Sequence, residues 1–218
     1  MQRVCQKANL GTKIVTKTHD ADAFIEAASF YLRPVEEDDY INHFQAWVND
    51  QEVTHFMWRG TMPSSKADAI DAFHEIRKSD NDVEFAIVAK DSGETIGFTG
   101  LHEVNNIYRS AEFRILIGEK SYWGKGVGTE ALKFLCAYGF ETLNLNRVSL
   151  GVNGANAGAL KSYEKAGFIT EGSLKQAIYR NGQYYDVTMM RLLKDEYNKA
   201  LEAWSCKNEI IQRFRNSG

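Results

Sequence analysis

Hydrophobic positions in the first part of the chain predict a strand followed by two amphipathic helices. Residues 29–35 are rich in strand-forming side chains, and the run ends at a proline. After Asp38 and Asp39, apolar residues recur every three or four positions, and a second such stripe follows the helix-capping types Ser64 and Ser65. The positions expected to be buried in these two helices are Tyr40, Ile41, Phe44, Trp47, Val48, Ala69, Ile70, Phe73 and Ile76.

Three strand signals follow, at residues 83–90, 95–101 and 110–117, with a turn at Asp91-Ser-Gly93 between the first two. The third alternates most cleanly, which is typical of a strand that presents different residues to its two faces. One face would carry Ala111, Phe113, Ile115 and Ile117, and the other Glu112, Arg114 and Leu116.

A Gly-rich turn then leads into a long helix, and the pattern continues with a strand at 147–152 and a helix at 156–166 that ends at Gly167. The apolar side of the long helix would comprise Val127, Ala131, Leu132, Leu135, Tyr138 and Thr142.

The last part of the chain predicts a hairpin and a helix. Residues 168–174 and 184–193 form paired strands, and Asn181-Gly182 supplies the turn between them. Residues 194–214 are expected to be helical and either to close the domain or to make a contact.

Together these elements predict a single mixed α/β domain at residues 29–193. Residues 1–28 have scattered charge and weak periodicity and are interpreted as an N-terminal extension, and residues 194–218 as a C-terminal helical extension. No repeat, low-complexity segment or linker interrupts the domain, and a length of 218 residues fits one domain with extensions.

Composition narrows the class of protein. With 26 basic against 29 acidic residues and a net charge of −3, the chain is not built to bind nucleic acid electrostatically. It has no run of about 18 apolar residues, so we expect no membrane span, and its N-terminus lacks the apolar core of a secretory signal. Cys5, Cys136 and Cys206 have no metal-ligand spacing and cannot all pair within one chain, which favours a reduced, cytoplasmic protein without a metal.

The segment at 122–129, Tyr-Trp-Gly-Lys-Gly-Val-Gly-Thr, lies between a predicted strand and a predicted helix. Glycines allow close approach of the backbone to a ligand, and the helix N-terminus adds free N–H groups, so this turn predicts a diphosphate site. The spacing matches neither the Walker loop, since Lys125 is followed by Gly126, nor the dinucleotide loop, since position 131 is Ala. On spacing alone, a purely structural turn stays open.

Two motifs together carry a family resemblance: Gly126-x-Gly128 after a strand, and Asn-x-x-Ala-x-x-x-Tyr-x-x-x-Gly-Phe at 156–168. They resemble the motifs of the GNAT superfamily of acetyl-CoA-dependent N-acetyltransferases. The sequence Tyr-Trp-Gly-Lys-Gly at 122–126 resembles that of its branch of ribosomal-protein, polyamine and amino-sugar acetyltransferases. The resemblance covers about residues 30–193. It implies a twisted, mixed, largely antiparallel sheet of about six to seven strands with a splayed parallel pair, flanked by helices.

The resemblance also implies that coenzyme A lies where the strands at 111–117 and 147–152 separate. The pantetheine arm would pair with backbone groups of Leu116 and Gly118, and an N–H near Leu116 would polarise the thioester carbonyl. Trp123 stands where the family often has Gln or Arg, so we expect the backbone of this loop to hold the diphosphate. The implied cofactor-binding residues are Leu116, Ile117, Gly118, Trp123, Gly124, Lys125, Gly126, Val127, Gly128, Thr129 and Asn156.

Two residues are catalytic candidates by the same resemblance. Tyr163 would donate a proton to the departing thiolate, and Glu112 would take a proton from the acceptor amine, which is almost fully protonated at neutral pH. Two alternatives stay open: that Glu112 only pairs with Arg114 or Arg147, and that a water chain serves as the base. Asn156 would cap its helix and also touch the cofactor.

The acceptor pocket is expected between the first two helices and the hairpin at 183–193. Residues that could attract or enclose an amine there are Glu36, Glu37, Asp38, Asp39, Glu52, Tyr179, Tyr184, Tyr185 and Asp186. Helix starts explain the first four equally well, and we interpret Trp47, Phe56, Met57 and Trp58 as core.

The function expected from these features is acetyl transfer from acetyl-CoA to a primary amine by direct attack in a ternary complex. The acceptor stays open among a protein N-terminus, a polyamine and an amino sugar, and a homodimer is an open assembly. An inactive coenzyme A-binding sensor or scaffold is the alternative. Neither a nucleic acid nor a membrane is an expected partner.

Overall fold

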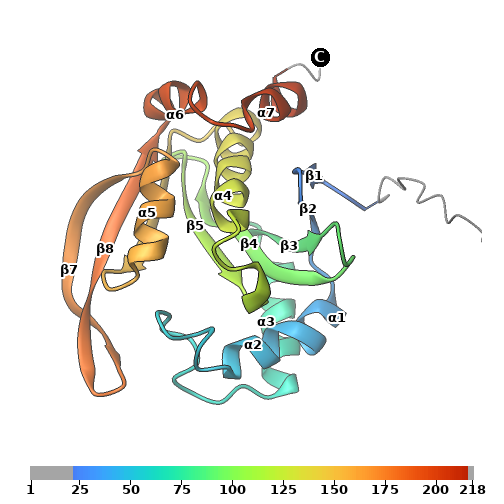
Figure 1. Cartoon of the computed structure of the whole chain (residues 1–218), viewed down its shortest axis with the longest axis vertical. Coiled ribbons are helices and arrows are strands. Elements are labelled where there is room, and N and C mark those ends of the chain that lie inside the picture. The colour runs from blue at the N-terminus through green and yellow to red at the C-terminus, as the bar shows by residue number, and fades with distance from the viewer. Residues whose placement is uncertain (1–21, 216–218) are drawn as a thin grey trace, which may run out of the picture.

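The computed structural model describes residues 22–215, and a single sheet organises them (Figure 1). Its strands are β1 (Ile25–Glu26), β2 (Phe30–Pro34), β3 (Val83–Ala89), β4 (Thr95–Asn105), β5 (Ser110–Ile117), β6 (Arg147–Asn153), β7 (Ile169–Arg180) and β8 (Gln183–Leu193). They lie in the order β1-β2-β3-β4-β5-β6-β8-β7. Only β5 and β6 are parallel, and all other neighbours are antiparallel.

Apart from a short 3-10 turn at 120–122, the helical segments fall where the hydrophobic stripes predict them. They are α1 (Glu37–Asp39), the π-helical η1 (Tyr40–Phe44), α2 (Gln45–Asn49), α3 (Lys66–Lys78), the 3-10 turn η2 (Lys120–Tyr122), α4 (Val127–Ala137), the π-helical η3 (Tyr138–Thr142), α5 (Ala157–Lys165), α6 (Lys194–Leu201) and α7 (Lys207–Phe214). Ser65 begins α3 as predicted, because its hydroxyl accepts a hydrogen bond from the Asp68 N–H while the Asp68 carboxylate accepts one from the Ser65 N–H.

The mixed, largely antiparallel sheet is confirmed, but it has eight strands, one more than the predicted upper count. The additional strand, β1, lies in the segment interpreted as an N-terminal extension and pairs with β2 through Ile25 and Glu26. Two residues are too few to show an alternating pattern, so no periodicity could reveal this strand.

Two helical layers cover the sheet, one on each face. The helices α4–α7 pack on one face around Leu132, Leu135 and Phe140, and α1–α3 pack on the other around Tyr40, Trp47 and Phe98. Figure 1 shows α1–α3 at the lower end of the molecule and α6 and α7 at the upper end. β5 contributes side chains to both layers. Phe113 packs in the core under α4–α7 and Leu116 in the core under α1–α3, as the alternation along the strand predicts.

The parallel pair separates after only three paired positions. Ser110 pairs with Arg147, Ala111 with Val148 and Glu112 with Ser149, and no further pairing joins β5 to β6. β6 nevertheless stays paired with β8 as far as Asn153. The backbone edge of β5 beyond Glu112 is therefore left without a neighbouring strand.

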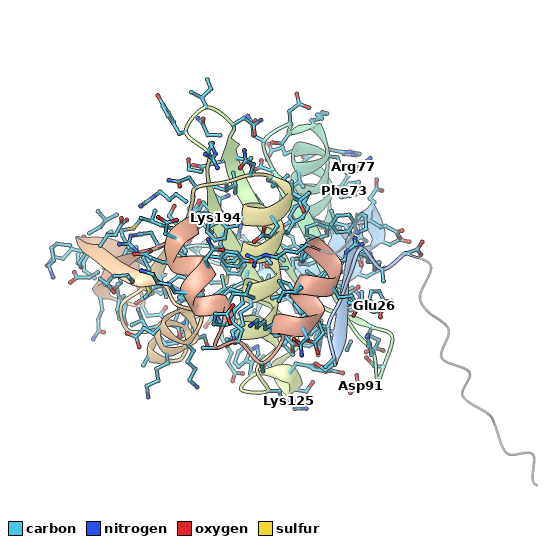
Figure 2. The ribbon with its side chains drawn as sticks, turned by 90° about the horizontal axis from the view of Figure 1, so that it is seen from above. Glu26, Phe73, Arg77, Asp91, Lys125 and Lys194 are labelled. Carbon is cyan, nitrogen blue, oxygen red and sulfur yellow. The ribbon has the colours of Figure 1, made fainter. Side chains whose placement is uncertain are left out.

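The C-terminal helices belong to the same core as α4. Figure 2 shows α6 and α7 lying on either side of α4, and Tyr197, Leu201 and Ile210 are fully buried among its neighbours. The predicted helix at 194–214 therefore closes the sheet, and it does so as two helices.

Replacing a buried side chain of α7 should consequently destabilise the whole domain. We expect Ile210→Ala to lower the free energy of unfolding by about 2–5 kcal/mol, because it leaves a cavity in the main core. Ile211→Ala, at a half-buried neighbour, is the control and should cost clearly less. Denaturant titration measures both, and equal small losses would show that α7 contributes little to the core.

Candidate active site

The turn between β5 and α4 presents backbone N–H groups that have no protein partner. Gly124 and Gly126 adopt left-handed φ angles of 71° and 88°, and a side chain at either position would meet open space. Among residues 22–215, nothing accepts a hydrogen bond from the backbone N–H groups of residues 124–129. Because these donors include the first turn of α4, the turn can hold an anion such as a diphosphate.

Side chains on both sides hold this turn in place. The indole N–H of Trp123 donates to the Ile117 carbonyl at 2.8 Å, which ties the turn back to the end of β5. The hydroxyl of Tyr122 donates to Asp91 at 2.7 Å in the β3–β4 turn, and the Lys125 ammonium lies 5.1 Å from the centre of the Tyr122 ring. The Trp123 side chain therefore supports the loop, and Lys125 adds positive charge beside it.

The open edge of β5 differs in one respect from the expectation for Leu116 and Gly118. The Gly118 N–H donates to the Ile96 carbonyl at 3.0 Å, so it points towards β4 and is engaged. Backbone groups alternate in direction along a strand, so Leu116 also directs its groups to β4, while Ile115 and Ile117 direct theirs to the open edge. The groups available to a pantetheine arm are therefore those of Ile115 and the N–H of Ile117, since the Ile117 carbonyl already accepts from Trp123.

Gly118 has a packing role instead. A Cβ atom at this position would lie 1.8 Å from the Trp47 ring, so only glycine lets α2 approach the end of β5. The Trp47 indole N–H donates to Glu119 at 3.3 Å on the same turn. This contact fixes the helical layer at the C-terminal end of β5.

Tyr163 lies on α5, facing β5 across the separated strands. Its ring is 6.4 Å from that of Phe113 on β5 and 6.2 Å from that of Phe168, and burial raises the pKa of its hydroxyl to about 12. Within residues 22–215 this hydroxyl has no hydrogen-bond partner. A protonated, unpaired hydroxyl at this place can donate to a bound group over the whole physiological pH range.

Asn156 caps α5, because its side-chain oxygen accepts a hydrogen bond from the Ala159 N–H at 3.0 Å. This cap accounts for the oxygen of the carboxamide and leaves its NH₂ group available. A contact between Asn156 and a cofactor stays a prediction.

Glu112 lies on the opposite face of β5, and its carboxylate is paired. Its Oε2 accepts from Arg114 Nε at 3.0 Å and from Nη2 at 2.5 Å, and Glu103 accepts from the same guanidinium at 3.0 Å. Arg147 bonds Glu171 instead, so of the two pairings left open the structure shows the one with Arg114. A role of Glu112 as base stays a prediction.

The same face carries a polar cluster that the sequence did not single out: Tyr40, Asp82, Glu84 and His102. Tyr40 donates a hydrogen bond to Glu84, and the buried His102 Nδ1 lies 3.3 Å from Asp82. Burial lowers the pKa of His102 despite that carboxylate, so the ring stays neutral at physiological pH. The one available signal was Glu84, a carboxylate in an otherwise apolar strand.

Among the acids expected to attract an amine, Asp39 and Glu52 are already used within the protein. Asp39 is buried and bonds Arg33 at 2.7 Å, and although burial acts the other way, this bond and those from Glu36 and Thr95 hold its pKa below the usual value. Glu52 pairs with Lys120 at 2.6 Å. The exposed acids Glu36, Glu37 and Asp38 remain at the start of α1.

The β7–β8 hairpin reaches the α2–α3 loop through a residue that the sequence analysis missed. Arg180 is buried, and its guanidinium donates to the carbonyls of Met57 and Arg59 at 3.2 and 2.8 Å and to the Thr54 hydroxyl at 2.9 Å. It precedes the Asn181–Gly182 turn, which forms as predicted. Arg180 thus joins the two walls expected around the acceptor.

The aromatic residues beside these walls are partly misassigned by the sequence. Trp47 is buried as predicted, but Trp58 is 69% exposed, because the 50–63 loop carries it away from the core. Tyr179 and Tyr184 are also exposed, with ring centres 4.9 Å apart, and Asp186 pairs with Lys175 at 2.7 Å.

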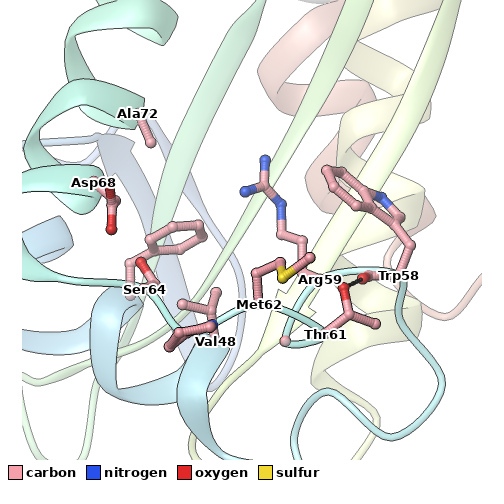
Figure 3. A pocket seen from close by; sticks show the side chains of 11 residues that line it. Val48, Trp58, Arg59, Thr61, Met62, Ser64, Asp68 and Ala72 are labelled. Atoms are coloured by element: carbon pink, nitrogen blue, oxygen red, sulfur yellow. Dashed lines mark hydrogen bonds between the residues drawn. The ribbon is translucent and has the colours of Figure 1, made fainter.

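A cavity of about 230 Å³ lies between α2, the 58–64 loop and α3 (Figure 3). The Arg59 guanidinium lies in it, 5.4 Å from the Phe44 ring centre and 4.9 Å from that of Trp58. Asp68 and the exposed Met62 line the cavity as well. It adjoins the wall that Arg180 holds.

The anion-binding turn, the open strand edge and the unpaired tyrosine suit a nucleotide-linked thioester. A model of the acetyltransferase (GNAT) domain matches residues 29–169. The chain belongs to the GNAT acetyltransferase family. It is accordingly an acetyl-CoA-dependent N-acetyltransferase.

Similar GNAT proteins match this chain over most of their own length. It is 32% identical over 171 residues to spermidine N(1)-acetyltransferase of Escherichia coli, covering 78% of this chain and 89% of that protein. It is 33% identical over 168 residues to an uncharacterised N-acetyltransferase of Bacillus licheniformis, covering 76% and 93%. The crystal structure of spermidine N-acetyltransferase from Vibrio cholerae in complex with CoA and spermine superposes with a TM-score of 0.72 at 28% identity, covering 79% and 99%.

Residues 22–215 contain no cluster of three or more His, Cys, Asp or Glu side chains arranged to hold a metal ion. In the same range no helix combines the length and the apolar character that crossing a bilayer requires.

The geometry of the turn predicts how one substitution affects coenzyme A binding. Gly126→Ala adds no clash, but it forces a non-glycine residue into the left-handed region at a cost of about 1–2 kcal/mol. Since relief of that strain would rotate the N–H groups, we expect coenzyme A affinity to fall about 5- to 30-fold in calorimetric titration. Gly182→Ala, equally left-handed in the distant hairpin turn, is the matched control and should leave this affinity unaltered.

Proposed function

We propose that this GNAT enzyme acetylates a primary amine of a polyamine in a ternary complex with acetyl-CoA. The observation that supports this acceptor class is the set of carboxylates on the α1–α3 face of the central strands. Asp82, Glu84, Glu103 and Glu112 lie there around the single cation Arg114 of these strands. Such a face favours a cationic acceptor, and the spermidine acetyltransferases named above act on that class.

The cofactor would be held mainly by main-chain groups. The N–H groups of residues 124–129 bind the diphosphate, with Lys125 as a nearby charge, and the edge groups of Ile115 and Ile117 bind the pantetheine arm. Acetyl-CoA supplies the activated acetyl group. An edge N–H of β5 polarises the thioester carbonyl, which carries negative charge in the transition state.

Tyr163 would act on the leaving group. Its hydroxyl stays protonated, has no partner within the described chain and faces the gap between β5 and β6. In this role it hydrogen-bonds the sulfur and gives it a proton as the carbon–sulfur bond breaks. The NH₂ group of Asn156, at the start of the same helix, would contact the pantetheine arm.

The acceptor class can be tested directly. Purified enzyme is incubated with acetyl-CoA and, separately, with spermidine, spermine, a peptide bearing a free N-terminus and a nucleotide-linked amino sugar. We expect thiol release, and acetylated product by mass spectrometry, with the polyamines. Acetylation of the peptide or the sugar but not of the polyamines would contradict this acceptor class while leaving the transferase activity intact.

The role of Tyr163 gives a separate prediction. Tyr163→Phe keeps the ring contacts and removes only the hydroxyl, so we expect kcat to fall about 100-fold while coenzyme A affinity changes less than threefold. Steady-state kinetics and calorimetry measure the two effects. An unaltered kcat would exclude Tyr163 from proton transfer, and an equal loss of affinity would make it a binding residue.

A further inference from the structure

Arg180 is a buried cation whose side-chain hydrogen bonds reach a single segment, residues 54–59 of the loop between α2 and α3. Its guanidinium donates to the Thr54 hydroxyl at 2.9 Å and to the carbonyls of Met57 and Arg59 at 3.2 and 2.8 Å. These three acceptors are neutral, and no carboxylate within residues 22–215 forms an ion pair with Arg180. Its bonds therefore hold a loop in place and do not neutralise an acid, and bonds from a charged donor are the stronger kind.

The loop is folded around the hydroxyl that Arg180 bonds. Thr54 is fully buried, and its hydroxyl donates to the Asp50 carbonyl at 2.8 Å while it accepts from Arg180. Gly60 lies against the same hydroxyl, because a Cβ atom there would come within 2.4 Å of it, and its φ of 81° turns the chain back. The two ends of this segment thus meet at Thr54, and Arg180 binds at that meeting point.

The start of the loop is joined to the cofactor-binding turn. Lys120 lies in η2, directly before the turn at 122–129, and its ammonium pairs with Asp50 at 2.8 Å and with Glu52 at 2.6 Å. Figure 1 shows the loop extending from α2 towards the lower part of the β7–β8 hairpin. The loop therefore runs from the C-terminal end of β5, where Lys120 holds it, to the hairpin, where Arg180 holds it.

The hairpin belongs to the other side of the gap between β5 and β6. β8 stays paired with β6 as far as Val187, which lies opposite Asn153. Arg180 lies further along the same hairpin, opposite Gln183. β5, η2, the loop at 50–59, the hairpin and β6 are therefore linked in a closed ring, and the gap lies inside it.

We propose that Arg180 is a positioning residue that closes this ring and holds residues 54–59 as a fixed wall of the acceptor site. The inference rests on the amine acetylation proposed above and adds a residue that acts on the acceptor side. The diphosphate site lies at the start of α4, so the α1–α3 side of the sheet is left for the amine, and the loop lies on that side. Arg180 places the wall through its three bonds and does not contact the reacting atoms.

A wall that is fixed before the amine arrives raises the affinity for the amine. Where a binding-competent arrangement exists in only a fraction of molecules, the apparent dissociation constant increases by the inverse of that fraction. Without Arg180, two carbonyls and a hydroxyl lose their charged donor, and water satisfies them only when the loop opens. Val53 and Met57 pack against the α1–α3 core, so the loop stays attached to the domain and the change is local.

Steady-state kinetics with the amine that the wild type acetylates best test this role. For Arg180→Met we expect KM for the amine to rise about tenfold, as for a wall ordered in about a tenth of the molecules, while kcat and coenzyme A affinity change less than about threefold. Arg180→Lys keeps the charge and can donate to part of the same set of oxygens. Its KM should lie between those of Arg180→Met and the wild type.

Arg109→Met is the matched control. The Arg109 guanidinium likewise bonds a carbonyl and a side-chain oxygen, both of Asn144, at 2.7 and 2.8 Å. These residues precede the N-terminal ends of β5 and β6, away from the gap at the other ends of these strands. All three kinetic and binding values of this variant should equal those of the wild type.

Amide hydrogen exchange reports the wall itself, without any acceptor. The Thr54 N–H bonds the Asp50 carbonyl at 3.0 Å and the Met57 N–H bonds the Thr54 carbonyl at 2.9 Å. Both amides should exchange about tenfold faster in Arg180→Met, while the amides of α4 keep their wild-type rates. Thr54→Val removes one of the three acceptors and keeps the shape, so it should change KM and exchange in the same direction by less. Together with Arg180→Lys it carries both measurements if Arg180→Met does not fold.

Two results would overturn the inference: a KM for the amine close to the wild-type value in folded Arg180→Met, or unaltered exchange of Thr54 and Met57. Equal losses in amine KM, kcat and coenzyme A affinity would also overturn it, because they would make Arg180 a structural residue of the whole domain. A wild type that acetylates no amine would instead contradict the proposed function, and the exchange rates alone would then decide whether Arg180 holds the loop.

Discussion

The interruption of pairing between β5 and β6 is the constraint on which the site depends. After Glu112 and Ser149 the two strands separate, although β6 remains paired with β8 and β5 with β4. An interior strand edge without a partner leaves backbone donors and acceptors unsatisfied, which is unfavourable unless a ligand or water bonds them. The unsatisfied backbone groups at this gap therefore favour the binding of an extended ligand. The N–H groups of residues 124–129 and the Tyr163 hydroxyl lie at the two sides of the gap.

Local patterns were sufficient for every strand except the two-residue β1 and for the longer helices. The faces of β5, the caps at Ser65 and Asn156 and the Asn181–Gly182 turn all follow from side chains close together in the sequence. The direction of the β5 backbone groups could not be predicted from the sequence. Side-chain alternation shows which face of the sheet a residue occupies, but not towards which neighbouring strand its N–H points. Only the bond from Gly118 to Ile96 settles that direction, and it moves the available groups from Leu116 and Gly118 to Ile115 and Ile117.

Long-range polar contacts were beyond the sequence for a different reason. Arg180 meets Thr54 across 126 positions, and Tyr40 meets Glu84 across 44, so no spacing rule could pair them. In the sequence, each contact is visible only as an exception to a local pattern. Arg180 is a charge directly before a hairpin turn, and Glu84 is a charge in an otherwise apolar strand. Glu112 shows the converse, since its place in a motif suggested a base while its contact with Arg114 could be seen only in three dimensions.

The two faces of β5 separate the candidate acid Tyr163 from the carboxylates of the central strands. Phe113 and Tyr163 lie on the α4–α5 face, where burial keeps the tyrosine protonated, whereas the carboxylates lie on the α1–α3 face. An acid and a base on one face would tend to exchange a proton with each other or to pair. Separated by the strand, the Tyr163 hydroxyl keeps its proton, while Glu112 on the other face pairs with Arg114.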